Sequence, residues 1–223
     1  MCKKMTAYAL RLKEYIDSMD DFDIISPEPC PYMDHIGAVF TDSILQAGVN
    51  YRKVVWPRVN YVLLTFPYAD TVHSFAEVLE QYGTSNVLHW NNKDKIRRME
   101  ELVSFCMDNA IDTADELTEY LRYDLHLDEM KSINGIGDKT CDYMKRLLGF
   151  DTVAVDRHVR AFIESADIMC REYYDIKEVV EFAADFMNCA RRELDYSIWN
   201  YMSKKEHRAY QLTFDFEQNN GLE

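Results

Sequence analysis

The sequence lacks any apolar run that approaches the ~18–20 residues of a membrane-spanning helix. Its first nineteen residues have the pattern of an amphipathic helix that contains acidic side chains, which is not typical of a signal peptide. We therefore expect a cytoplasmic protein without a membrane partner.

Cysteine pairs at metal-binding spacing are also absent. The chain has six cysteines, none of them in a C-x-x-C pair: Cys2, Cys30, Cys106, Cys141, Cys170 and Cys189. Neither a disulfide framework nor a four-cysteine iron–sulfur site is therefore predicted. Other metal-ligand spacings, internal repeats and low-complexity tracts are also absent.

Positive charge is scarce. The chain has 25 Lys and Arg against 39 Asp and Glu, a formal net charge of −14. Binding nucleic acid over the whole surface would need clustered Lys and Arg, so the composition argues against it. Residues 131–160 are the exception, with six basic and four acidic side chains. They predict a local, salt-sensitive interface, and the acidic segment 108–129 is expected to face away from it.

Helical periodicity dominates the chain and predicts an all-α protein of one compact unit or two small lobes. The proline-rich stretch 26–31 predicts a boundary between lobes. Thr71 and Thr113 are expected to cap helices, the latter in a capping box with Glu116. The tail from residue 206 alternates weakly, as a strand does, through Leu212, Phe214 and Phe216.

The chemically most informative stretch begins at Ile133–Gly137, an apolar–Gly–apolar–Gly turn between two helical patterns. Glycine permits close approach of a ligand, and the N-terminus of the following helix attracts anions such as phosphate. Lys139 lies in the first turn of that helix, where an ammonium is disfavoured and a nucleophilic amine is favoured. Asp156 precedes another amphipathic run and is expected to cap it as a carboxylate.

These residues resemble the helix-hairpin-helix DNA glycosylase superfamily, most closely its endonuclease III and 8-oxoguanine glycosylase branches. The likeness rests on INGIGDKTC at residues 133–141, on Gly149 and on Val155–Asp156. It covers about thirty residues closely and most of the chain loosely. The iron–sulfur version of endonuclease III is excluded because its cysteine cluster is missing.

The resemblance implies two helical lobes with the active site in the cleft between them. Residues 34–150 would form a helical barrel that ends in the helix-hairpin-helix, at about 128–148. Residues 1–33 would pack with a second lobe, 151–205, and 206–223 would form a tail.

The resemblance further implies a monomeric base-excision repair glycosylase with associated abasic-site (AP) lyase activity on double-stranded DNA that contains a lesion or an abasic site. Lys139 would form a Schiff base with the sugar, and Asp156 would assist it. Two alternatives remain open. One is a monofunctional glycosylase in which Asp156 activates water, and the other is a non-catalytic DNA-binding or partner-binding protein.

Further roles follow from the family pattern. Gln46 would probe the gap left by a flipped base. Independently of the family pattern, Trp199 or Tyr201 would stack on that base, because aromatic side chains stack well on extruded bases. The remaining DNA-binding candidates are Lys131, Gly135, Gly137, Thr140 and Arg157. No cofactor is expected beyond a candidate Na⁺ or K⁺ held by the main-chain carbonyls of Lys131, Ile133 and Ile136.

Each assignment has a purely structural alternative. In these alternatives, Lys139 does no more than neutralise a phosphate, and Asp156 does no more than cap a helix. Gln46 is then an ordinary surface residue. Trp199 and Tyr201 could belong to the core, and the turn could hold water instead of a cation. His158 is expected on an exposed helix face.

Three positions depart from the family pattern. Asn134 replaces proline, Asp138 introduces an acid beside the expected phosphate, and Cys141 replaces a small residue. Asp138 should weaken DNA binding by like-charge repulsion. The sequence does not identify the lesion.

Overall fold

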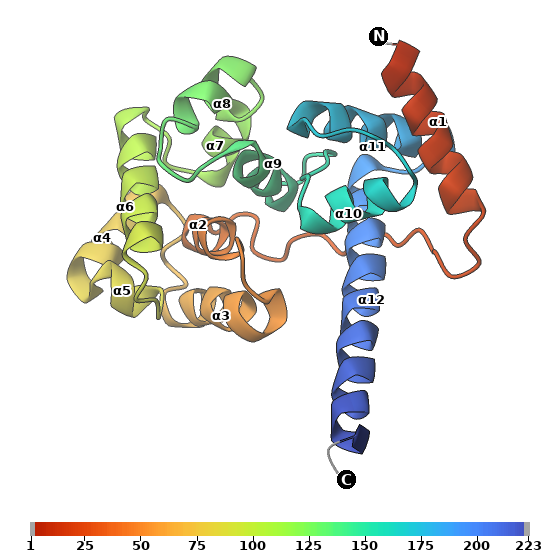
Figure 1. The fold of residues 1–223 in the computed structure, drawn as a ribbon. Coiled ribbons are helices and arrows are strands. Elements are labelled where there is room, and N and C mark those ends of the chain that lie inside the picture. Colours follow the sequence, from red (N-terminus) through yellow and green to blue (C-terminus); the bar gives the residue numbers. More distant parts are fainter. Residues whose placement is uncertain (1–2, 221–223) are drawn as a thin grey trace. The chain divides into compact units, whose positions relative to one another are not determined.

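The computed structural model describes the backbone of residues 3–220 and the side chains of residues 3–205. All regular secondary structure in this part of the chain is helical, which confirms the all-α prediction (Figure 1). The chain divides into two compact units: residues 29–150, here the central unit, and residues 1–28 with 151–223, here the terminal unit. The predicted lobes were 34–150 and 1–33 with 151–205.

The central unit contains eight α-helices and one π-helical turn within its described residues. They are α2 (Ile36–Leu45), η1 (Tyr51–Val55), α3 (Trp56–Thr65), α4 (Val72–Tyr82), α5 (Thr84–Val87), α6 (Lys93–Asp108), α7 (Ala114–Tyr120), α8 (Asp124–Met130) and α9 (Asp138–Leu147).

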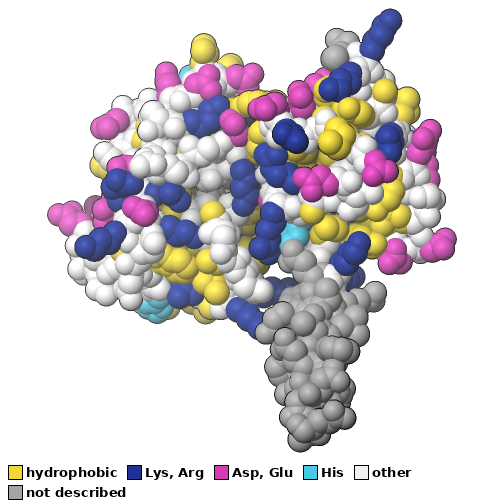
Figure 2. Space-filling view, in the orientation of Figure 1, with side chains coloured by type: hydrophobic (Ala, Val, Ile, Leu, Met, Phe, Trp, Pro, Cys, Tyr) yellow, Lys and Arg dark blue, Asp and Glu magenta, His cyan; other side chains and the backbone are white. Residues whose placement is uncertain are grey.

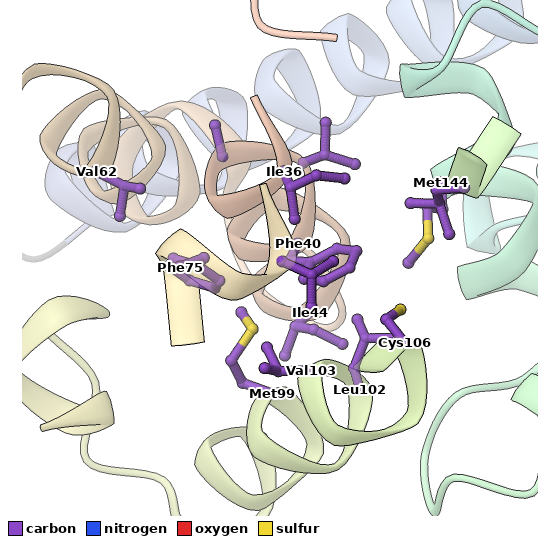
Figure 3. Close-up of a cluster of buried hydrophobic side chains, with 14 of the residues drawn as sticks. Ile36, Phe40, Ile44, Val62, Phe75, Met99, Leu102, Val103, Cys106 and Met144 are labelled. Carbon is purple, nitrogen blue, oxygen red and sulfur yellow. The ribbon is translucent and has the colours of Figure 1, made fainter. Parts of the chain in front are cut away.

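Helix α2 is the centre of this unit, and every one of its residues is buried. Its sequence is predominantly apolar, as is typical of a helix enclosed by others, and α3, α4, α6 and α9 pack against it. Figure 3 shows Ile36, Phe40 and Ile44 pointing into a cluster with side chains from these neighbours. A Cβ on Gly37 would lie 2.7 Å from the Phe75 ring, so α2 and α4 approach too closely for a larger residue.

The helix N-termini at Thr71 and Thr113 were correctly predicted from local sequence. Thr71 and Thr113 form capping boxes with Ser74 and Glu116, which supply hydrogen-bond partners at the helix N-termini. Pro57 lies in the opening turn of α3, where the missing N–H costs little.

The terminal unit contains α1 (Lys3–Asp17), α10 (Arg157–Ser165), α11 (Tyr173–Met187) and α12 (Arg191–Asn220). Helix α1 packs against α11, and α12 packs against α10 and α11. Ser26 donates a hydrogen bond to Glu193, and the Ile25 N–H donates to the Ser197 hydroxyl over 2.8 Å. These bonds tie the segment after α1 to α12.

Two sequence predictions are wrong. The tail is no strand, because α12 continues through Asn220. Extending an existing helix avoids the unfavourable nucleation step. Residues 191–220 also contain neither Pro nor Gly, the residues that most often end a helix. His158 is buried rather than exposed, because the register of α10 turns it inward beside Val159 and Phe162.

Candidate nucleic-acid site

The glycine turn connects α8 to α9 in the central unit. The Ile136 N–H donates to the Ile133 carbonyl over 3.0 Å, and both side chains are buried beneath the turn. Gly135 is exposed and has φ +90°, a conformation that side chains rarely adopt. The position of an added Cβ lies 1.7 Å from the Arg98 guanidinium, so Gly135 also makes room for that side chain.

Helix α9 begins immediately after this turn. Gly137 is its N-cap, and the Gly137 carbonyl accepts hydrogen bonds from the N–H groups of Thr140 (2.9 Å) and Cys141 (3.1 Å). The first N–H groups of a helix have no acceptor within it and can meet an anion. Gly137 is exposed with open space around it, whereas Thr140 is buried.

Lys139 and Gln46, singled out separately in the sequence, are in contact. The Lys139 ammonium donates a hydrogen bond to Gln46 Oε1 across 93 positions of the chain. The same ammonium lies 5.7 Å from the ring centroid of Tyr143, one turn further along α9. The Gln46 amide nitrogen is buried and has no acceptor among the described residues. A buried donor without a partner costs about 1–3 kcal/mol and calls for an explanation.

A buried carboxyl group lies behind this contact. Asp42 accepts hydrogen bonds from the hydroxyls of Tyr143 (3.0 Å), Tyr32 (2.5 Å) and Tyr51 (3.0 Å). Burial raises the pKa of the Asp42 carboxyl, and the three hydroxyls oppose that shift. Sequence reasoning missed this cluster, although an aspartate in the predominantly apolar helix α2 was a signal for it.

Lys131 and Asp138 form an ion pair. The Lys131 ammonium lies 2.8 Å from Asp138 Oδ1 and 2.7 Å from Asp128 Oδ1. The predicted repulsion of phosphate by Asp138 is therefore partly offset. Lys131 is thus paired with two carboxylates, and its predicted contact with DNA stays a prediction.

A group of cations next to the turn was also missed. Lys95 donates hydrogen bonds to the carbonyls of Leu45 (2.6 Å) and Ala47 (2.9 Å), at the end of α2. Arg98 Nε donates to the Asn134 carbonyl over 3.0 Å. Burial, followed by the charges of Arg98 and Lys139, lowers the pKa of the Lys95 ammonium to about 8. The basic run 93–98 after Trp90 was the available sequence signal.

Figure 2 gives the surface setting of these groups. The visible face of the central unit carries several Lys and Arg side chains, and Asp and Glu side chains are visible on the same unit.

Asp156 lies in the terminal unit and is the N-cap of α10, as predicted. Its Oδ1 accepts hydrogen bonds from the N–H groups of His158 (2.8 Å) and Val159 (3.0 Å). Arg157 is exposed beside it. Because Lys139 belongs to the central unit, the predicted meeting of its amine with Asp156 stays a prediction.

The two aromatic candidates for a base pocket lie on α12. Tyr201 packs against Phe22 and Phe162, with ring centroids 5.5 Å and 6.0 Å away. Trp199 stacks on Tyr196 at 5.8 Å. The packing of Tyr201 supports the core alternative for that residue, and a role in base stacking stays a prediction.

Within the described residues, no group of three or more His, Cys, Asp or Glu side chains could hold a metal ion. In the same part of the chain, no helix has both the length and the apolar character needed to cross a membrane.

Comparison with known proteins gives one match. A family model described as "Domain of unknown function (DUF8548)" matches residues 12–203. Comparisons with curated proteins and with solved structures each find no match. Since the matched region spans most of the 223 residues, the chain belongs to this family, DUF8548.

Proposed function

We propose that the protein is a DNA glycosylase with associated abasic-site lyase activity. The observation that carries the proposal is the contact between Lys139 and Gln46 beside the exposed glycine turn. The unsatisfied Gln46 amide nitrogen suits a residue that meets its partner only when DNA is bound. The turn, the following helix N-terminus and the nearby cations suit a phosphate. In the proposed fold, α8, the turn and α9 form the helix-hairpin-helix of a barrel lobe.

The turn would hold the DNA backbone next to the reacting sugar. A monovalent cation on the main-chain carbonyls of Lys131, Ile133 and Ile136 would add positive charge for a phosphate oxygen. Carbonyl oxygens are suitable ligands for such an ion, and the Ile133 carbonyl, which accepts one hydrogen bond from Ile136, has a second lone pair available.

Lys139 would act as the nucleophile. Its neutral amine attacks C1′ of a flipped nucleotide, the C1′–N bond breaks, and the base leaves with its electron pair and takes up a proton. Opening of the sugar ring gives a Schiff base to Lys139. Loss of a C2′ proton then expels the 3′ phosphate by β-elimination, and water releases the amine.

Asp156 would stabilise the positive charge that develops on the sugar as the C1′–N bond breaks. Its carboxylate is already oriented, because two backbone N–H groups hold one of its oxygens. This role requires α9 and α10 to face the same bound nucleotide.

Borohydride trapping tests the proposal. Wild-type protein incubated with duplex DNA containing an abasic site should give a covalent adduct after reduction, and Lys139→Gln should give none. Lys145→Gln removes another lysine of α9 and should leave trapping intact. Absence of an adduct with any abasic or lesion-containing duplex would contradict the lyase.

A second candidate function is favoured by one observation. The hydrogen bonds of Asp156 account for it fully as a helix cap, as expected of a non-catalytic DNA-binding protein. Asp156→Asn distinguishes the two functions. The enzyme should lose base release and keep duplex affinity, whereas the binding protein would release no base in either form.

A further inference from the structure

Four side chains of the central unit form a continuous group, here called the Trp90 band: Arg58, Trp90, Lys95 and Arg98. The Arg58 guanidinium and the Lys95 ammonium each lie 4.9 Å from the centroid of the Trp90 ring. Lys95 and Arg98 are three positions apart on α6, so they share one helix face. Arg98 reaches the glycine turn through its bond to the Asn134 carbonyl.

The cations of this band have no carboxylate partner within 4 Å among the described residues. Arg97, the neighbour of Arg98, provides the contrast, since it lies 3.8 Å from Asp94 and 3.6 Å from Glu101. In a chain with 39 acids and 25 bases, a cluster of cations without carboxylates is unexpected by composition. Their mutual repulsion is unfavourable unless an anion compensates for it.

Backbone bonds hold these side chains while leaving donors available. Arg58 donates from Nε to the His89 carbonyl (3.1 Å) and from Nη1 to the Val54 carbonyl (2.6 Å). Arg98 uses only Nε among its five N–H donors for a described partner. The guanidinium groups are therefore fixed in place with remaining donors for phosphate oxygens.

We propose that the Trp90 band binds the sugar–phosphate backbone of a nucleic acid, extending the interface of the glycine turn along α6 to α3. The identity of the polymer as duplex DNA rests on the proposed function. The proposal that the band binds phosphates rests on the geometry of its side chains and on the absence of carboxylate partners within 4 Å among the described residues. Each phosphate contact adds counterion release, so the band contributes affinity that is independent of sequence and sensitive to salt.

The experiment measures binding of an intact, lesion-free duplex by fluorescence anisotropy at several salt concentrations. Arg98→Gln should weaken binding several-fold at moderate salt and reduce the slope of log K against log salt by about one. Arg97→Gln is the matched control on the adjacent position. Since Arg97 is already paired with two carboxylates, its removal should leave the slope unchanged.

Arg98 also contacts the turn, so a second variant separates the band from the turn. Arg58 lies on α3 and is hydrogen-bonded to His89 and Val54 rather than to the turn. The Arg58→Gln variant should nevertheless reduce the slope of log K against log salt to a similar extent. Thermal unfolding of each variant checks that it folds. Equal slopes for wild type, Arg98→Gln and Arg58→Gln, or an equal loss in Arg97→Gln, would overturn the inference.

These results are independent of catalysis. If wild-type protein forms no borohydride adduct while Arg98→Gln and Arg58→Gln reduce the salt slope, the lyase is refuted and the band is retained. Trapping that persists while the band variants bind like wild type refutes the band and keeps the lyase.

Discussion

At the scale of single residues, Asp42 is a buried polar group held by several hydrogen bonds. It is fully buried and is the shared acceptor of three tyrosine hydroxyls. One of these, Tyr143, also lies beneath the Lys139 ammonium. The carboxyl group therefore connects the core of the unit to the proposed nucleophile.

Asp42→Ala should destabilise the protein by about 3 kcal/mol, because it removes the shared acceptor of one buried and two half-buried hydroxyls. Asp42→Asn keeps one acceptor oxygen and should cost less. Urea denaturation monitored by circular dichroism measures both free energies of unfolding. An Asp42→Ala protein as stable as wild type would show that the hydroxyls find other acceptors.

The same carboxyl group predicts a pH dependence. Burial raises its pKa above the ordinary value of 3.8, so the folded protein binds this proton more tightly than the unfolded chain does. The stability of wild type relative to Asp42→Asn should therefore rise as pH falls from the folded-state pKa towards 3.8. Denaturation midpoints of both proteins over this range measure the difference, and a constant difference would contradict the raised pKa.

Lys95 gives a second pH dependence, in binding. Its pKa is lowered to about 8, the groups facing it being Arg98, Lys139 and the Trp90 ring. A bound phosphate favours the ammonium form, so binding above this pKa requires uptake of a proton. Duplex affinity should fall by about tenfold between pH 7 and 9, and Lys95→Met should remove most of that fall. Equal pH dependence in the two proteins would exclude Lys95 from the interface.

At the scale of elements, local sequence predicts helices well and contacts between them poorly. The caps at Thr71, Thr113 and Asp156 were predictable because capping depends on the next two or three residues. The contact of Gln46 with Lys139 depends on how α2 and α9 pack, which no local pattern encodes. The same holds for the tyrosines around Asp42.

The glycine turn between α8 and α9 allows a test at this scale. Gly135→Ala should destabilise the protein by about 1–2 kcal/mol, because φ +90° strains a side chain and the new Cβ displaces Arg98. Gly137→Ala is the control, since its φ is −119° and the space around it is open. Thermal or urea unfolding compares the two, and equal effects would contradict the close approach at Gly135.

The turn variant should also affect binding. If the Arg98 guanidinium must move to admit the Cβ, Gly135→Ala and Arg98→Gln act on the same contact. Their effects on duplex affinity should then be less than additive in a double-mutant cycle. Fully additive effects would indicate that the turn and Arg98 contribute separately.

At the scale of the whole molecule, the proposed chemistry is divided between two units. The central unit carries Lys139, Gln46 and the Trp90 band, and the terminal unit carries Asp156. The sequence predicted both catalytic candidates by resemblance, and the structure describes the surroundings of each within its own unit. The proposed chemistry would require both units to act on one nucleotide.

The most direct test of this account is the identity of the residue that becomes bonded to DNA. The reduced adduct with abasic-site DNA would be digested with protease and nuclease, and the modified peptide would be sequenced by mass spectrometry. The account predicts a single modified residue, Lys139, and no adduct in Lys139→Gln. A modification at another lysine, or an adduct that persists in Lys139→Gln, would contradict it.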